Sequence, residues 1–201
     1  MTNKNKSIQK RLLYAIPGGA HTYSRGYDQF PSNAPDILSK GKGAYVFDNN
    51  GNKYLDYGMA LRAVNIGYSE KIINQAAFDQ ILNGNNLTKP STIELEAAEL
   101  LIKEIKSIDM VKFTKNGSTA VSAGVKLARA YTGRDLIARC SQHPFFSYDD
   151  WFIGSTPIKK GIPKSIQKLT KHFYYNDIES LEKLIKRYPN KIACVVLEPA
   201  T

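Results

Sequence analysis

Long apolar runs are absent from this sequence. No stretch of the 201 residues approaches the roughly 20 consecutive apolar residues that a membrane-spanning helix needs. The opening MTNKNKSIQK is polar, where a secretory signal would be apolar. With 42% hydrophobic and 23% charged residues, the sequence predicts a cytoplasmic globular protein with one sizeable core, or one core and a small lobe.

Cysteine is scarce, and acidic residues are outnumbered. Cys140 and Cys194 each lie in an apolar, strand-like run without a CxxC or His/Cys cluster, so we expect buried free thiols and no metal site. Lys and Arg exceed Asp and Glu by 28 to 18, but they are spread over every segment. This spread favours a solvated surface over a nucleic-acid partner, and leaves a basic nucleic-acid binder as an alternative.

The sequence pattern of the N-terminal third predicts a small α+β lobe, an arm followed by a β-hairpin, which we place at residues 1–68. Apolar spacing predicts a short helix over 4–14, ended by Pro17-Gly18-Gly19. The run ILSKGKGAYVFDNNGNKYLDY alternates apolar and polar residues on both sides of residues 49–52, which is typical of a β-hairpin.

From residue 69 to 201, helix-like and strand-like segments alternate. Such alternation predicts an α/β domain with a mostly parallel sheet and flanking helices, and a buried last strand predicts that the domain is incomplete. We expect a helix capped by Ser69 that runs through Leu82, a helix capped by Ser91 or Thr92 that reaches Ile105, a helix over Thr119–Tyr131 and a helix capped by Asp177. We expect strands over Met110–Phe113, Leu136–Cys140, Phe173–Tyr175 and Ile192–Leu197.

The run Lys115-Asn116-Gly117-Ser118-Thr119 is the strongest candidate site. A glycine and hydroxyl residues at the start of a helix present free backbone N–H groups and the positive end of the helix dipole to an anion. The run contains neither a Walker loop nor a GxGxxG fingerprint. It predicts a phosphate site, although such a start is also common in ordinary capped turns, and a non-catalytic phosphate-binding α/β module is a second reading.

The segment KFTKNGSTAVSAGVKLARAYTGRDLIARC resembles the cofactor phosphate-binding segment of class III pyridoxal-phosphate-dependent aminotransferases. The segments PGGAHTYSRG, GKGAYVFDNNGNKYLDY, ELEAAELL, YND and VVLEPA have similar counterparts, in the same order, in the glutamate-1-semialdehyde 2,1-aminomutase-like branch. The resemblance implies a fold type I transferase, pyridoxal 5'-phosphate as cofactor, and a homodimer with the active site at the subunit boundary.

The resemblance also implies site residues. Asn116, Gly117 and Ser118 fall on phosphate-contacting positions, whereas Thr119 replaces a glutamate common in the family. His143 matches the histidine of a Tyr-His-Gly sequence whose tyrosine is replaced by Gln142. The ring that stacks on the cofactor would then be Phe145 or Phe146, both of which could equally pack in the core.

The arm after Pro-Gly-Gly carries the implied substrate contacts. Arg25 matches an arginine that pairs with the substrate carboxylate, a role that suits a two-pronged guanidinium, and Thr22 matches a neighbouring hydroxyl position. Leu61 and Arg62 depart from the Trp-Gly of authentic aminomutases. This departure favours a transaminase over an aminomutase of tetrapyrrole synthesis, which remains the alternative.

No residue of this sequence matches the catalytic lysine. In the family, the lysine that binds the cofactor covalently and the aspartate that faces the ring nitrogen both follow the LEPA segment, beyond Thr201. We therefore expect the 201 residues alone to be inactive, although the full-length protein is expected to transfer amino groups.

Overall fold

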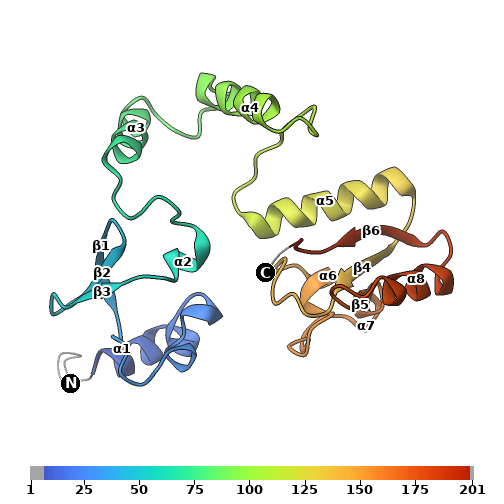
Figure 1. The fold of residues 1–201 in the computed structure, drawn as a ribbon, viewed down its shortest axis with the longest axis horizontal. Helices are drawn as coiled ribbons and strands as arrows, with labels where there is room; N and C mark the ends of the chain where they lie inside the picture. Colours follow the sequence, from blue (N-terminus) through green and yellow to red (C-terminus); the bar gives the residue numbers. More distant parts are fainter. Residues whose placement is uncertain (1–6, 200–201) are drawn as a thin grey trace. The chain divides into compact units, whose positions relative to one another are not determined.

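The computed structural model describes residues 7–199. The chain divides after Pro90 into two compact units, Met1–Pro90 and Ser91–Thr201. Figure 1 shows the elements of each unit. The boundary at residues 68 and 69 that we expect from the sequence stays a prediction about the domains of the protein. Within the described part, no helix is both long and apolar enough to cross a membrane.

The first unit begins with helix α1 (Ile8–Ala15), capped by the Ser7 hydroxyl. The expected helix over 4–14 is confirmed from Ile8 onward, while residues 4–6 lie outside the described range. Three single 3-10 turns then form the arm: η2 (Pro17–Gly19), η3 (Tyr23–Arg25) and η4 (Tyr27–Gln29).

The expected hairpin forms the centre of this unit. Strands β1 (Leu38–Lys42), β2 (Tyr45–Asp48) and β3 (Lys53–Leu55) make an antiparallel sheet in that order. The Asp48 carboxylate accepts hydrogen bonds from the Asn50 and Asn52 backbone N–H groups at 2.8 and 2.9 Å, and Gly51 supplies a positive φ of 86°. The Asn-Asn-Gly-Asn run closes the turn because short polar side chains bond the local backbone there.

A left-handed turn, α2 (Met59–Arg62), follows the sheet. Its four residues have φ values of 46°, 49°, 63° and 69°, although none of them is glycine. Non-glycine residues pay about 1–2 kcal/mol each for left-handed helical backbone. Leu61 and Arg62, which the resemblance matches to the Trp-Gly of authentic aminomutases, therefore lie in the segment of the described chain where backbone strain is concentrated.

Two helices end the first unit and begin the second. Helix α3 (Lys71–Leu82) is capped by the Glu70 carboxylate, so the expected cap at Ser69 is wrong. The Ser69 hydroxyl instead donates to the Gly41 carbonyl at 2.9 Å, in a residue with φ of 56°. Helix α4 (Thr92–Glu104) begins with a capping box between Ser91 and Glu94, which confirms the expected start.

The second unit contains the predicted parallel sheet. Strands β4 (Leu136–Cys140), β5 (Thr170–Phe173) and β6 (Ile192–Val196) lie in the order β5-β4-β6, and both pairings are parallel. Strand β5 begins and ends earlier in the sequence than the strand that we expect over 173–175. Phe173 faces Cys140, the last residue of β4, and beyond it the Tyr174 N–H bonds the Ser180 hydroxyl instead of a strand.

The expected strand at Met110–Phe113 is wrong. This run is irregular, and Met110 is 88% exposed. A strand requires a hydrogen-bonded neighbour, and among the described residues the central strand β4 already has β5 and β6 on its two sides. Because it has no partner strand among the described residues, this apolar run is irregular and unpaired.

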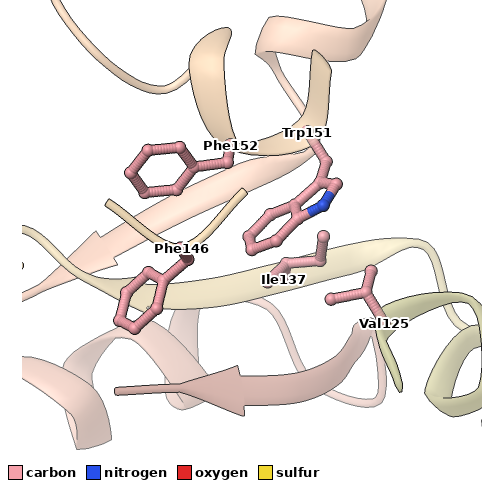
Figure 2. Close-up of a cluster of buried hydrophobic side chains, with 5 residues drawn as sticks. All are labelled: Val125, Ile137, Phe146, Trp151 and Phe152. Atoms are coloured by element: carbon pink, nitrogen blue, oxygen red, sulfur yellow. The ribbon is translucent and has the colours of Figure 1, made fainter. Parts of the chain in front are cut away.

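Three helices pack on the parallel sheet, α5 (Gly117–Thr132), α6 (Asp150–Ile153) and α8 (Ile178–Arg187), and the short helix α7 (Lys164–Gln167) packs on α6. Because side chains alternate along β4, Ile137 packs with Val125 of α5 and Trp151 of α6, while Ala138 packs toward Leu181 of α8. Figure 2 shows the first of these clusters. The central strand is thus covered on both faces, as its continuous apolar sequence predicts.

Both cysteines are free, as expected. Cys140 is fully buried, and burial raises the pKa of the half-buried Cys194 thiol above its ordinary value. No group of three or more potential ligands that could hold a metal occurs in the described residues.

Candidate functional site

The candidate phosphate site is built at the N-terminus of α5. The helix begins at Gly117, two residues before the Thr119 start that we expect from the sequence. Asn116 moves the start forward because its side-chain oxygen accepts the Thr119 N–H at 2.9 Å and the Thr119 hydroxyl at 3.1 Å. Asn116 is therefore the cap of the helix, and its side-chain oxygen is already engaged.

Two backbone donors remain free at this end. Within residues 7–199 neither the Gly117 nor the Ser118 N–H has a hydrogen-bond acceptor, and the first intrahelical bond joins Ala120 N–H to the Asn116 carbonyl. A Cβ at Gly117 would have no atom within 4 Å. The two amides thus lack an internal acceptor at the positive end of a 16-residue helix, which suits a phosphate.

A surface depression of about 360 Å³ lies beside these donors. Its lining combines hydroxyl groups with one cation and one carboxylate: Asn116, Ser118, Thr119, Ser122, Ala123, Lys126, Tyr148 and Asp149. Residues from α5 and from the loop after β4 therefore meet at one concave surface.

The loop after β4 is tied directly to the first turn of α5. The Tyr148 N–H donates to the Ser118 hydroxyl oxygen at 3.2 Å, and the Ser147 hydroxyl donates to the Ser118 carbonyl at 3.3 Å. The carboxyl ends of parallel strands and the helix starts that follow them share one edge of an α/β sheet, where ligands commonly bind. This loop also contains the two other cofactor residues expected from the sequence, His143 and Phe145.

His143 is buried, with 3% of its surface exposed. Its Nδ1 accepts the Glu198 backbone N–H at 3.0 Å, and its ring lies edge-on to Phe146 and tilted against Tyr175. Nε2 is also buried, without a hydrogen-bond partner among the described residues. The histidine connects the loop after β4 to the end of β6 and keeps one unused polar atom.

The two candidate aromatic rings differ in accessibility. Phe146 is 9% exposed and belongs to the core cluster of Figure 2, whereas Phe145 is 52% exposed and touches Phe152 only edge-on. Gln142, at the family's aromatic position, accepts the Tyr175 N–H at 3.0 Å through its side-chain oxygen. Of the two phenylalanines, Phe145 is the one free to meet a ligand.

Arg139 is a loop-shaping residue that our sequence reading missed. Its guanidinium is buried and has no carboxylate partner in the described chain. It donates to the Ser155 hydroxyl and carbonyl and to the carbonyls of Cys140 and His143, while burial lowers its pKa. The signal was present, since a charged residue inside the apolar strand LIARC needs an internal set of acceptors.

The expected substrate residues lie in the first unit. Arg25 ends η3 and is exposed, and its backbone N–H donates to the Thr22 carbonyl at 2.9 Å. Its guanidinium has no carboxylate partner among the described residues, yet it is close enough to Tyr68 to oppose the rise in that phenol's pKa caused mainly by the hydrogen bond to Asp56. Arg25 thus keeps its two-pronged donor available for an external anion.

Comparison with known proteins places this geometry in a family. The model of the class-III aminotransferases matches residues 23–201. A glutamate-1-semialdehyde 2,1-aminomutase from Wigglesworthia glossinidia brevipalpis is 35% identical over 99% of this chain, and the match covers 47% of that protein. The chain thus spans about half the length of the curated relatives that it matches.

Solved transaminase structures also match this chain in fold. The FumI protein of Sphingopyxis sp. MTA144, in its PLP internal aldimine form, is 31% identical with a TM-score of 0.85, covering 94% of this chain and 44% of FumI. An omega-transaminase from Sphaerobacter thermophilus is 28% identical with a TM-score of 0.85, covering 96% and 46% of the two chains. From its sequence match and its fold, this chain belongs to the class-III aminotransferase family.

Proposed function

We propose that the protein transfers amino groups with pyridoxal 5'-phosphate, and that these residues supply the site for the cofactor's phosphate. The observation that carries this proposal is the pair of unpartnered N–H groups of Gly117 and Ser118 at the mouth of α5. An anion there would meet two donors and the helix dipole together. Family membership supports the choice of cofactor over a bare phosphate.

The roles of the other residues follow from their positions. The cofactor supplies an electron sink for the substrate's amine-bearing carbon. The exposed ring of Phe145 would cover its aromatic face, and His143 would hold the loop that carries this ring. Arg25, with Thr22 beside it, would orient the substrate through its carboxylate, since its guanidinium has no internal carboxylate to neutralise it.

We infer a transaminase as the first choice and an aminomutase as the second. Leu61 and Arg62 replace the Trp-Gly of authentic aminomutases, although a curated relative carries the aminomutase name. An assay of the whole protein separates the two. Conversion of glutamate-1-semialdehyde without an added amino acceptor supports the mutase, and strict dependence on a second keto substrate supports the transaminase.

The 201-residue chain alone is expected to show no turnover, because none of its lysines matches the catalytic position. A homodimer in the cytoplasm is our proposal for the whole protein, by analogy with the family. Turnover by the purified 201-residue chain, in either assay, would contradict the assignment of the catalytic lysine to a segment beyond Thr201.

The phosphate site can be tested with a substitution that removes one donor and little else. Gly117 is the first residue of α5, where proline is well tolerated, and Asn116 has the extended backbone that a residue before proline prefers. Gly117→Pro should therefore leave the helix intact while deleting one N–H. Thr92→Pro makes the same change at the first position of α4, away from the site, and is the matched control.

The readout is the binding of inorganic phosphate, followed through the backbone amide resonances of Ser118 and Thr119. Loss of one hydrogen bond to a charged group should weaken binding by about tenfold or more in Gly117→Pro. Thr92→Pro should bind like the unmodified chain. If phosphate moves none of these resonances in the unmodified chain, the proposed function loses the observation that carries it.

A non-catalytic phosphate-binding module is the second reading. It predicts phosphate binding equal to that of the cofactor, whereas an aminotransferase site should bind pyridoxal phosphate more tightly than inorganic phosphate because Phe145 adds a contact to the ring. Equal affinities, unchanged in Phe145→Ala, would favour the module.

A further inference from the structure

A chain of four hydrogen-bonding groups runs from the core of the second unit to the first turn of α5. Its members are Trp151, Ser122, Ser147 and Ser118, and we call it the hydroxyl relay. The Trp151 indole lies in the core cluster of Figure 2, while Ser122 and Ser147 are 3% and 0% exposed. Both hydroxyls are therefore almost entirely shielded from solvent and bond to protein groups.

Donor counting fixes the direction of the relay. The Trp151 indole N–H can only donate, and it reaches the Ser122 oxygen at 3.0 Å. With the single Ser147 hydroxyl proton directed to the Ser118 carbonyl at 3.3 Å, we assign Ser122 as the donor of its 2.8 Å contact with Ser147, in which either hydroxyl could donate by geometry alone. Every bond of the relay therefore points from the core toward the backbone carbonyl of Ser118.

The loop completes the arrangement around Ser118. The Asp149 N–H donates to Ser147 at 3.1 Å, and the Tyr148 N–H donates to the Ser118 hydroxyl oxygen at 3.2 Å. The Ser118 hydroxyl thus has its oxygen occupied by a donor, while its proton has no acceptor among residues 7–199. A hydroxyl in that state can satisfy its proton only by donating outward, and it lines the depression beside the free amides.

We propose that Ser147 is a positioning residue for phosphate binding: by bonding the Ser118 carbonyl and the Asp149 N–H, it holds the Tyr148 N–H against the Ser118 hydroxyl oxygen and so leaves that hydroxyl to donate to the bound anion. This inference rests on the proposed function, since it concerns the same site. It adds a third donor to the two backbone amides, from a loop about 30 residues further along the chain. The Tyr148 N–H, the Ser118 hydroxyl and the anion form a chain of two hydrogen bonds, and such bonds polarise one another, so the hydroxyl becomes a stronger donor when the anion binds.

The first test uses the unmodified chain titrated with inorganic phosphate. The amides of Gly117 and Ser118 report the anion itself, and the Tyr148 amide reports the relay because it is bonded to the Ser118 oxygen. We expect the Tyr148 resonance to shift with the same dissociation constant as the other two. A static Tyr148 with moving Gly117 and Ser118 overturns this inference but leaves the proposed function standing, and three static resonances overturn both.

The second test separates positioning from stability. Ser147→Ala removes the donor to the Ser118 carbonyl and the acceptor of the Asp149 N–H. Thr170→Val is the matched control, because Thr170 is a buried hydroxyl that donates to the Trp151 carbonyl at 2.7 Å and does not contact Ser118. Both substitutions should lower the unfolding temperature.

Only Ser147→Ala should weaken phosphate binding, by about three- to tenfold, the range that one neutral hydrogen bond supplies. Unchanged affinity in a folded Ser147→Ala chain, or an equal loss in Thr170→Val, would overturn the positioning role. If Ser147→Ala does not fold, the Tyr148 resonance in the unmodified chain still decides the question.

Discussion

The Nδ1 atom of His143 accepts the backbone N–H of Glu198 at 3.0 Å, which joins the loop after β4 to the end of β6. An N–H donor occupies Nδ1, so the proton of the neutral imidazole must sit on Nε2. We predict this single tautomer for the chain. Long-range proton–nitrogen spectra of histidine-labelled protein measure it directly, with Nε2 as the protonated nitrogen.

The exposed His21, which has no hydrogen bond among the described residues, provides the internal comparison. Its ring should show a mixture of the two tautomers, as a solvated imidazole does. Protonation of His143 at Nδ1 would contradict the geometry. It would also remove the basis for expecting His143 to hold Phe145 in place.

Arg62 adopts a φ of 69°, at the position that the resemblance to aminomutases matches to a glycine. Glycine pays no steric penalty there, so we predict that Arg62→Gly stabilises the first unit by about 1 kcal/mol. Urea unfolding measures the change. Arg62→Ala separates the loss of charge from the gain in backbone freedom and should not stabilise.

The next residue, Ala63, provides the opposite case. Its φ is −84°, an ordinary right-handed value, so Ala63→Gly should cost about 0.5–1 kcal/mol. Equal effects at positions 62 and 63 would mean that the left-handed turn is not the source of the strain.

Local chemistry made most of the elements predictable. The hairpin, the capping box at Ser91, the Asp177 cap of α8 and the strand at Leu136 to Cys140 all follow from signals that act over a few residues. The helix start at Gly117, where we propose the phosphate site, was predictable to within two residues for the same reason, since the residues that form it are adjacent in sequence.

Features that depend on a distant partner were not predictable. Met110 to Phe113 reads as a strand by composition, but strand formation requires a neighbour that the described chain does not place beside it. The hydroxyl relay joins Ser122 to Ser147 and Trp151 across 25 and 29 residues, a link that no local pattern encodes. The buried hydrogen bonds of Arg139 could have been predicted, because a charged residue inside an apolar strand requires internal acceptors.

The Asp48 carboxylate should make the hairpin acid-sensitive. Hydrogen bonds, chiefly from the Asn52 side chain, hold the pKa of Asp48 below its ordinary value of 3.8, although burial works in the opposite direction. A carboxylate whose folded pKa is depressed contributes stability above the unfolded value. That contribution is lost as the pH falls below 3.8 and through the folded pKa.

Two substitutions test this dependence. Asp48→Asn should lower stability at neutral pH and flatten the acid limb of the unfolding curve below pH 3.8. Asp36→Asn changes an exposed carboxylate without a hydrogen bond in the described residues and should leave the limb unchanged. An unaltered acid limb in Asp48→Asn would show that other groups govern it.

Substitution by alanine should change the stability in opposite directions at Gly124, inside α5, and at Gly133, which caps its C-terminus. Gly133 ends the helix with a φ of 67°, so Gly133→Ala should cost about 1 kcal/mol even though a Cβ would meet nothing within 4 Å. Gly124 lies inside the same helix, exposed and with open space around it, so Gly124→Ala should gain about 0.5–1 kcal/mol. Urea unfolding at one pH compares the pair. A loss at both positions would mean that the surface of α5 near Gly124 is covered by another part of the protein, because only a steric neighbour could reverse the expected gain.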